Sequence, residues 1–318
     1  MREREFEPIL NREKHQRDVK QYFSKHIDFL VDLVNYGSNL IPRVFDSSNK
    51  KLEDIVVIGV LLRQIVSMID AVEVLVSKGA VVAANLQART AFEASLYIDW
   101  ILKGESEKKA KYYYVSNLRN QRLWALRFKT GTPENEVFSS SFQYLGEYGK
   151  IAGLEDIEKQ AGEHLARIDS LLASETWNEI NLEFENKKKK KTDDEKYWYR
   201  MLGVSSIRRL ADQVGRLGEY NLYYSRGSEV AHTASYRDHI QFTKGIVVFE
   251  PIRYLQDLPI VLRFITLVAI SSYISVLKHY RYGELSHFRR KYMRDWREPY
   301  LNIPPVSYIT EIEHPGIP

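Results

Sequence analysis

Hydrophobic residues recur every three to four positions along the first 130 residues, and this spacing predicts long amphipathic helices. The expected helices cover about residues 13–36, 49–78, 80–103 and 105–129. Gly79, Gly104 and the turn around Pro133 separate them. Because these turns are very short, consecutive helices are expected to pack antiparallel.

Proline placement supports the same fold class. Of the ten prolines, only Pro133 falls between residues 43 and 250, so long helices are not interrupted there. Five prolines lie at or beyond Pro299. The segment Gly245–Phe249 is rich in β-branched residues and predicts a short strand. We therefore predict an all-α antiparallel helical bundle with a short β-like connector near 245–250 and an extended C-terminal tail.

The segment order predicts one helical domain over residues 1–298 and a tail over 299–318. The lysine run Lys187–Lys191, followed by three acidic residues, nearly neutralises itself. Such a composition buries little apolar area, so residues 186–196 are expected to form a mobile insert.

Composition narrows the functional classes. The chain has no cysteine, which excludes disulfides, thiolate metal sites and cysteine nucleophiles and fits a cytoplasmic location. The N-terminal residues are charged and carry no signal-peptide pattern. Within Leu258–Leu277, the uncharged part begins after Arg263 and spans 14 residues. A membrane span needs about 20, so a buried helix is expected and no membrane partner.

Positive charge is concentrated near the C-terminal end. Residues 278–297 hold seven Lys or Arg against two acidic residues, whereas the whole chain carries only +4. Arg289, Arg290 and Arg294 are candidates for contacts with nucleic-acid phosphates, with Phe288, Tyr292 and Trp296 as stacking surfaces. The alternative is a solvated helix face whose aromatic side packs inward.

Familiar nucleotide-binding and hydrolase motifs are missing, and no two of the eight histidines have the i, i+4 spacing of a metal site. We expect neither metal nor cofactor. Arg89 and Glu93 stand out, because they are i, i+4 neighbours in an otherwise apolar helix. They form either an ion pair within the bundle or an anion-binding site in which Glu93 orients Arg89.

A second candidate lies between residues 224 and 232. Tyr224, Ser228 and His232 are spaced i, i+4, i+8, so a helix would line up their polar groups. His232 at the end of this stripe is a candidate general acid or base. It is equally a candidate for capping carbonyl groups at a helix C-terminus.

These residues carry a resemblance. The pattern A-R-x-x-F-E at residues 88–93, with Y-x-x-x-S-x-x-x-H at 224–232, resembles an uncharacterised bacterial helical family, a domain of unknown function. A wider resemblance is to the HEPN superfamily, helical bundles whose catalytic members cut RNA without metal. Their signature is Arg, four to six residues, then His, which Arg226 and His232 match with five. Gly227 departs from it, since active members often place a polar residue there.

The HEPN resemblance implies a metal-independent endoribonuclease, a toxin or anti-phage effector, that acts on RNA as a homodimer. His232 would take the proton of a ribose 2′-hydroxyl, and Arg226 with Arg89 would stabilise the charged phosphate. The alternative is a non-catalytic interaction or sensing module in which the same polar residues form a structural network or a ligand pocket. Both hypotheses expect Arg89, Glu93 and His232 to converge in space.

Overall fold

The computed structural model describes residues 10, 12–142, 144, 154–189, 196–232, 239–243, 246–250 and 252–307. Helices dominate this part of the chain, and the predicted all-α helical bundle is confirmed. The α-helices are α1 (Arg12–Asp46), α2 (Val57–Ser77), α3 (Val81–Leu102), α4 (Ser106–Phe128), α5 (Pro133–Ser140), α6 (Leu154–Ala173), α7 (Glu175–Lys189), α8 (Trp198–Met201), α9 (Ile207–Gln213), α10 (Leu217–Glu219), α11 (Ser225–Ala231), α12 (Leu258–Tyr280), α13 (Leu285–Lys291) and α14 (Arg297–Leu301). Wider π-type turns form η1 (Leu52–Val56), η4 (Tyr220–Tyr224) and η7 (Tyr292–Trp296), and η6 (Tyr282–Glu284) is a 3₁₀ turn.

The chain divides into two compact units. The first comprises Met1–Lys51, Ile58–Gly104 and Leu210–Pro318, and the second comprises Leu52–Val57 and Glu105–Arg209. The first unit is thus built from three separate stretches of sequence. That residues 1–298 form a single domain stays a prediction.

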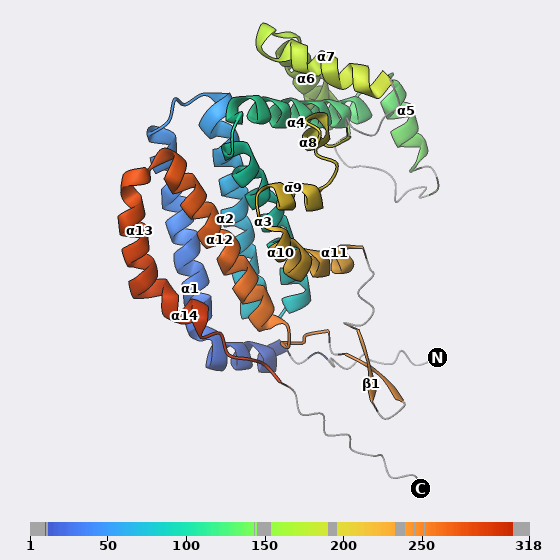
Figure 1. The fold of residues 1–318 in the computed structure, drawn as a ribbon. Helices are drawn as coiled ribbons and strands as arrows, with labels where there is room; N and C mark the ends of the chain where they lie inside the picture. The colour runs from blue at the N-terminus through green and yellow to red at the C-terminus, as the bar shows by residue number, and fades with distance from the viewer. Residues whose placement is uncertain are drawn as a thin grey trace, which may run out of the picture. The chain divides into compact units, whose positions relative to one another are not determined.

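Helices α1, α2, α3 and α12 form the body of the first unit (Figure 1). Helix α3 packs most extensively against α12, although more than 150 residues separate them in sequence. The rings of Phe92 and Phe264 lie 5.3 Å apart, and nearer the C-terminal end of both helices Ser275 donates to Asp99 over 2.6 Å. Both helices therefore run in the same direction, whereas the consecutive helices were expected to supply the central antiparallel contact.

Two glycines shape the packing of these helices, Gly37 through its small size and Gly79 through its backbone conformation. Gly37 of α1 faces α2 and α12, and a Cβ there would collide with the Tyr273 hydroxyl and with Val66. Gly79 ends α2 with φ +73°, a conformation that favours glycine, and the N–H of Ala80 donates to the Leu75 carbonyl over 2.8 Å. The predicted break at Gly79 is confirmed.

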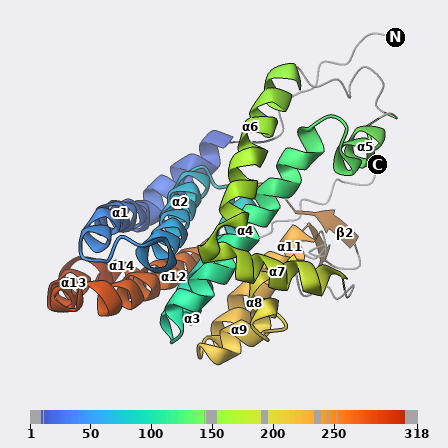
Figure 2. The ribbon, with the colours of Figure 1, turned by 90° about the horizontal axis from the view of Figure 1, so that it is seen from above.

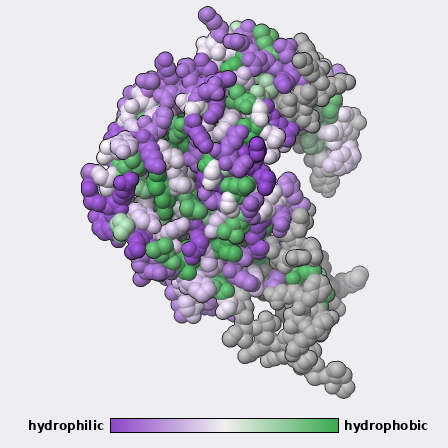
Figure 3. Space-filling view, in the orientation of Figure 1, coloured by the Kyte–Doolittle hydropathy of each residue, from purple (hydrophilic) through white to green (hydrophobic). Residues whose placement is uncertain are grey.

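Two helical segments, Leu52–Ser77 and Leu258–Tyr280, are long and apolar enough to cross a membrane by length and composition. Only the second was expected from the sequence to resemble a membrane span. Half of the apolar window in the first, and 61% of that in the second, is buried within the protein. On the face drawn in Figure 3, hydrophobic residues form separate groups among hydrophilic ones.

The expected β-like connector is the second strand of a hairpin. Strands β1 (Ile240–Thr243) and β2 (Ile246–Phe249) pair antiparallel, with Ile240 opposite Phe249. The predicted start of the tail at residue 299 is too early, because α14 continues to Leu301 and Pro299 is buried. Residues 308–318 of the tail lie outside the described residues.

In the second unit, α4 packs along α6 and α7 (Figure 2). Arg122 donates to Asp169 over 2.6 Å, and Arg119 pairs with Glu185 over 2.6 Å. Helix α7 continues to Lys189, so the first four residues of the insert predicted at 186–196 are helical. Residues 190–195 lie outside the described residues.

Candidate functional site

Arg89, Glu93 and Tyr224 form a closed hydrogen-bonded triangle in the first unit. Tyr224 donates its hydroxyl hydrogen to Glu93 Oε1 over 2.7 Å. Arg89 donates to the same hydroxyl over 3.0 Å and pairs with Glu93 over 3.1 Å. The Arg89 guanidinium also lies 4.8 Å from the centre of the Tyr224 ring. The ion pair predicted for α3 therefore finds its third partner on another element.

The π-type turn η4 presents Tyr224 to α3. Its wider winding places the rings of Tyr220 and Tyr224 in a stack 4.8 Å apart, and Tyr224 itself is buried. Burial, and then the adjacent Glu93 carboxylate, raise the pKa of the Tyr224 hydroxyl well above its ordinary value. Tyr224 therefore stays protonated and acts as a hydrogen-bond donor.

Gly227 explains how closely α11 approaches α3. A Cβ at this position would lie 3.0 Å from Arg89 Cβ and 3.3 Å from the Asn85 carbonyl oxygen. Any side chain here would push the helices apart. The residue that departs from the HEPN pattern is thus required by the packing of α11 on α3.

His232 does not join the triangle. Tyr224 lies beside Glu93, and Gly227 lies beside Arg89 and Asn85, so α11 runs antiparallel to α3. His232 follows Tyr224 by eight residues, about 12 Å of helix, in the direction away from Glu93. It is exposed and ends α11, with its N–H donating to the Ser228 carbonyl over 3.0 Å. The predicted convergence on Glu93 is therefore made by Tyr224 in place of His232.

Arg226 lies on the wall of a cavity of about 700 Å³, which we call the Arg226 cavity. Its guanidinium forms an ion pair with Asp257, the residue that precedes α12. The start of α3 and residues 252–257 form further walls, and Arg12 and Arg253 add two more positive charges. All the lining residues belong to the first unit. This arrangement is suited to binding a small molecule of negative charge.

A family model matches residues 54–245, which is more than half of the chain, and its description is a family of unknown function. The chain belongs to the DUF5677 family. The match covers both motifs quoted above, at 88–93 and 224–232, so the resemblance to an uncharacterised helical family is confirmed. No curated protein and no solved structure matches the chain.

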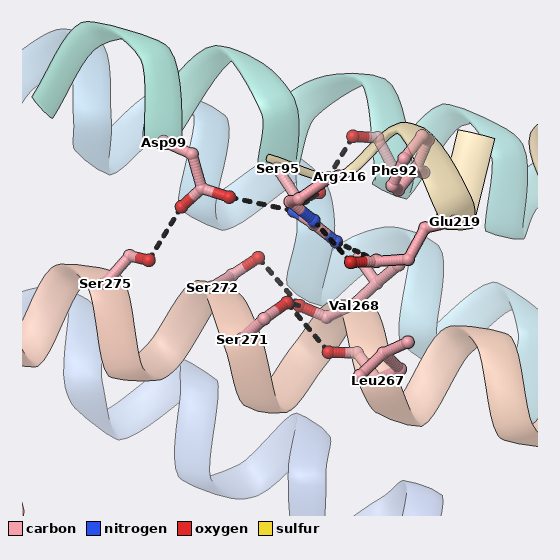
Figure 4. Close-up of polar contacts among 10 residues, drawn as sticks. All are labelled: Phe92, Ser95, Asp99, Arg216, Glu219, Leu267, Val268, Ser271, Ser272 and Ser275. Atoms are coloured by element: carbon pink, nitrogen blue, oxygen red, sulfur yellow. Dashed lines mark hydrogen bonds and ion pairs between the residues drawn. The ribbon is translucent and has the colours of Figure 1, made fainter. Parts of the chain in front are cut away.

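The segment matched by DUF5677 ends before residue 257, yet Asp257, the residue that precedes α12, completes the cavity wall. Helix α12 completes a buried network that sequence reasoning missed. Arg216 donates to Asp99 over 2.9 Å, to Ser95 over 2.8 Å and to Glu219 over 2.5 Å (Figure 4). Ser275 of α12 donates to the other oxygen of Asp99.

Arg216 is buried and also lies over the ring of Phe92, 4.8 Å from its centre. Its position follows Gly215, a turn residue with φ +78°, so no helical periodicity includes it. The sequence did offer one sign of this network. Asp99 is a carboxylate in an apolar helix, so it needs a cationic partner for the same reason as Glu93. The hydrogen-bonding groups of Arg216 and Asp99 bind one another and their neighbours within the network. We therefore assign this network a structural role.

The side chains predicted to contact nucleic acid, on α13 and η7, are exposed only in part. Phe288 and Trp296 are buried, so they offer no surface for stacking bases, whereas Tyr292 is half-buried. Arg289 and Arg290 are exposed, whereas Arg294 pairs with Asp295 over 2.7 Å. The solvated helix face, proposed as the alternative, is the arrangement observed. In the described part of the chain, no three His, Asp or Glu side chains form a metal-binding group.

Proposed function

We propose that this protein is a non-catalytic helical module that binds a small anionic ligand in the Arg226 cavity. The observation that carries the proposal is the presence of three arginines, from three separate elements, on the wall of one cavity. Arg12 begins α1, Arg226 belongs to α11 and Arg253 precedes α12. Acidic residues in the same wall are Glu250 and Asp257, so positive charge is in excess.

The triangle of Arg89, Glu93 and Tyr224 supports this function by holding α11 in place. Because Arg89 and Glu93 neutralise each other and both contact the Tyr224 hydroxyl, they present no spare charge to a ligand. Their effect is to press η4 and Gly227 against α3. Arg226, next to Gly227, is thereby held at the cavity wall. In this proposal Arg89 and Glu93 are positioning residues.

The test is calorimetric titration of the full-length protein with four small anions: adenosine 5′-monophosphate, 1-naphthyl phosphate, 1-naphthoate and inorganic phosphate. We expect at least one to bind, and Arg226→Gln to weaken that binding at least tenfold. Arg208→Gln is the matched control, because Arg208 is exposed and belongs to the second unit. Absence of binding by all four anions would contradict the proposal, as would equal weakening by both substitutions.

One observation favours a second candidate, the metal-independent endoribonuclease. His232 is exposed and directly follows α11, the short helix that carries Arg226. We propose that His232 would accept the proton of a ribose 2′-hydroxyl, whose oxygen then attacks the neighbouring phosphorus and releases the 5′-oxygen. Proton return from His232 to that oxygen completes the step. Arg226 would neutralise the phosphorane, and a homodimer in the cytoplasm would bind RNA through Arg289 and Arg290.

The nuclease predicts cleavage of RNA in the presence of a metal chelator. His232→Ala should reduce the rate at least a hundredfold, the usual effect of removing a general base, whereas His287→Ala, at an exposed position of α13, should leave it unchanged. Light scattering tests the dimer, and growth arrest on expression tests the toxin role. An intact RNA substrate after incubation with the wild-type protein would overturn this candidate.

A further inference from the structure

The wall of the Arg226 cavity has a positively charged part and an apolar part. Arg12, Arg226 and Arg253 supply its positive charge. Apolar side chains supply much of the rest: Leu10, Val82, Leu86 and Ile252. A ligand that is only an anion would leave the apolar part in contact with water, and a ligand that is only apolar would leave the arginines unused. The wall therefore matches a molecule with an anionic end and an apolar body.

Arg253 carries a nitrogen atom whose hydrogen-bonding capacity the described residues leave unused. Its Nη1 is buried and has no hydrogen-bond partner among the described residues. A buried donor without a partner is costly, more so when it is charged. If the Arg253 side chain turns to bring Nη1 to the cavity surface, an oxygen atom of a bound anion would remove this cost.

The start of α3 lies in the same wall. Ala80 precedes the helix and has no side chain that can cap it, so the described residues give no side-chain cap to the first N–H groups of α3. Val81 and Val82, which carry two of these groups, also line the cavity. The positive end of a 22-residue helix thus adds to the charge of the arginines.

From these observations we infer that the ligand is a phosphate monoester of an apolar or aromatic body; this rests on the proposed function. The donors belong to separate elements of the cavity wall. A tetrahedral phosphate dianion offers three oxygens to such donors, whereas a planar carboxylate offers two in one plane. The volume of about 700 Å³ falls in the range of sites for drug-sized molecules and far exceeds what inorganic phosphate fills.

The negative charge of Asp257 lies in the cavity wall and should weaken the binding of a phosphate ester. It already neutralises Arg226, and it would repel an incoming phosphate. Asp257→Asn removes this negative charge and should tighten phosphate-ester binding at least threefold. A role of Asp257 limited to holding α12 would instead lower stability with no gain in affinity.

The experiment compares dissociation constants at pH 7.5, where the ester is mainly a dianion. We expect adenosine 5′-monophosphate or 1-naphthyl phosphate to bind at least tenfold more tightly than both inorganic phosphate and 1-naphthoate. Arg253→Gln should abolish the preference for 1-naphthyl phosphate over 1-naphthoate, and Arg208→Gln should preserve it. Competition between the two esters checks that they share one site.

The outcomes separate the two proposals. Binding of 1-naphthoate or inorganic phosphate as tightly as the esters would overturn the phosphate-ester inference and leave the anion-binding function intact. Binding of none of the anions would overturn both. Ester binding that is insensitive to Arg253→Gln and to Asp257→Asn would place the ester elsewhere and overturn the inference.

Discussion

Tyr224 donates its hydroxyl hydrogen to Glu93 Oε1 over 2.7 Å, across 131 positions of the sequence. This contact joins η4 to the middle of α3 and gives the carboxylate a neutral donor beside its cationic one. Removing the hydroxyl leaves Glu93 and Arg89 with only each other.

Tyr224→Phe should therefore destabilise the protein by about 2 kcal/mol, the range for a hydrogen bond to a charged group. The measurement is the free energy of unfolding in urea. Tyr220→Phe is the control, because the Tyr220 ring takes part in the same stack but the triangle does not include its hydroxyl. Equal losses in both variants would show that ring packing, and not the hydroxyl, matters.

Gly227→Ala should destabilise the protein by about 1–3 kcal/mol, since the added methyl group meets Arg89 Cβ at 3.0 Å and the Asn85 carbonyl oxygen at 3.3 Å. Gly218→Ala is matched, because a Cβ there meets nothing within 4 Å. It should be neutral or slightly stabilising. If Gly227→Ala were as stable as Gly218→Ala, the close approach of α11 to α3 would be refuted.

Arg216→Met should cost about 3–5 kcal/mol, the usual effect of removing one partner from a buried ion pair. Asp99 and Glu219 would keep their charges without the cation between them. Thermal unfolding of the full chain measures the loss. Arg290→Met, at an exposed position of α13, should shift the midpoint very little. A small effect at both positions would contradict the structural role of the network.

The pH dependence of stability tests the burial of His26. Burial lowers the pKa of His26, so the unfolded chain binds the proton more readily than the folded protein. This contribution to stability is complete above about pH 6.5 and is lost as the pH falls through the folded-state pKa. The stability lost between pH 7.5 and pH 5 should therefore be smaller in His26→Gln than in the wild type. His287→Gln, on the surface, should keep the wild-type difference.

The helices were predictable because their causes are local. Periodic apolar residues and the break at Gly79 are visible in the sequence, and they place α2, α3 and α4 closely. Helix α1 continues through Pro42 to Asp46, ten residues beyond the end predicted at Tyr36. The need of Arg89 and Glu93 for a partner was also predictable from the apolar character of α3. The identity of that partner was not, because it depends on the direction in which α11 crosses α3.

Spacing alone made Tyr224, Ser228 and His232 equal members of one stripe. The close contact at Gly227 sets the register, and it brings only Tyr224 to Glu93. Arg216 shows the same limit, since it lies between two helices and its role appears only when α3, α10 and α12 are assembled. Which residues of two distant helices face each other is decided by how the core packs, and a single sequence does not reveal it.

The chain leaves the first unit after Gly104 and returns to it at Leu210. Gln213, just after the return, accepts hydrogen bonds from both Trp100 and Lys103, just before the exit. The two ends of the excursion are thus tied together by contacts that belong wholly to the first unit. Insertions are tolerated best where the host keeps the two ends close. We therefore expect that changes in the length or sequence of residues 105–209 leave the walls of the Arg226 cavity unaltered.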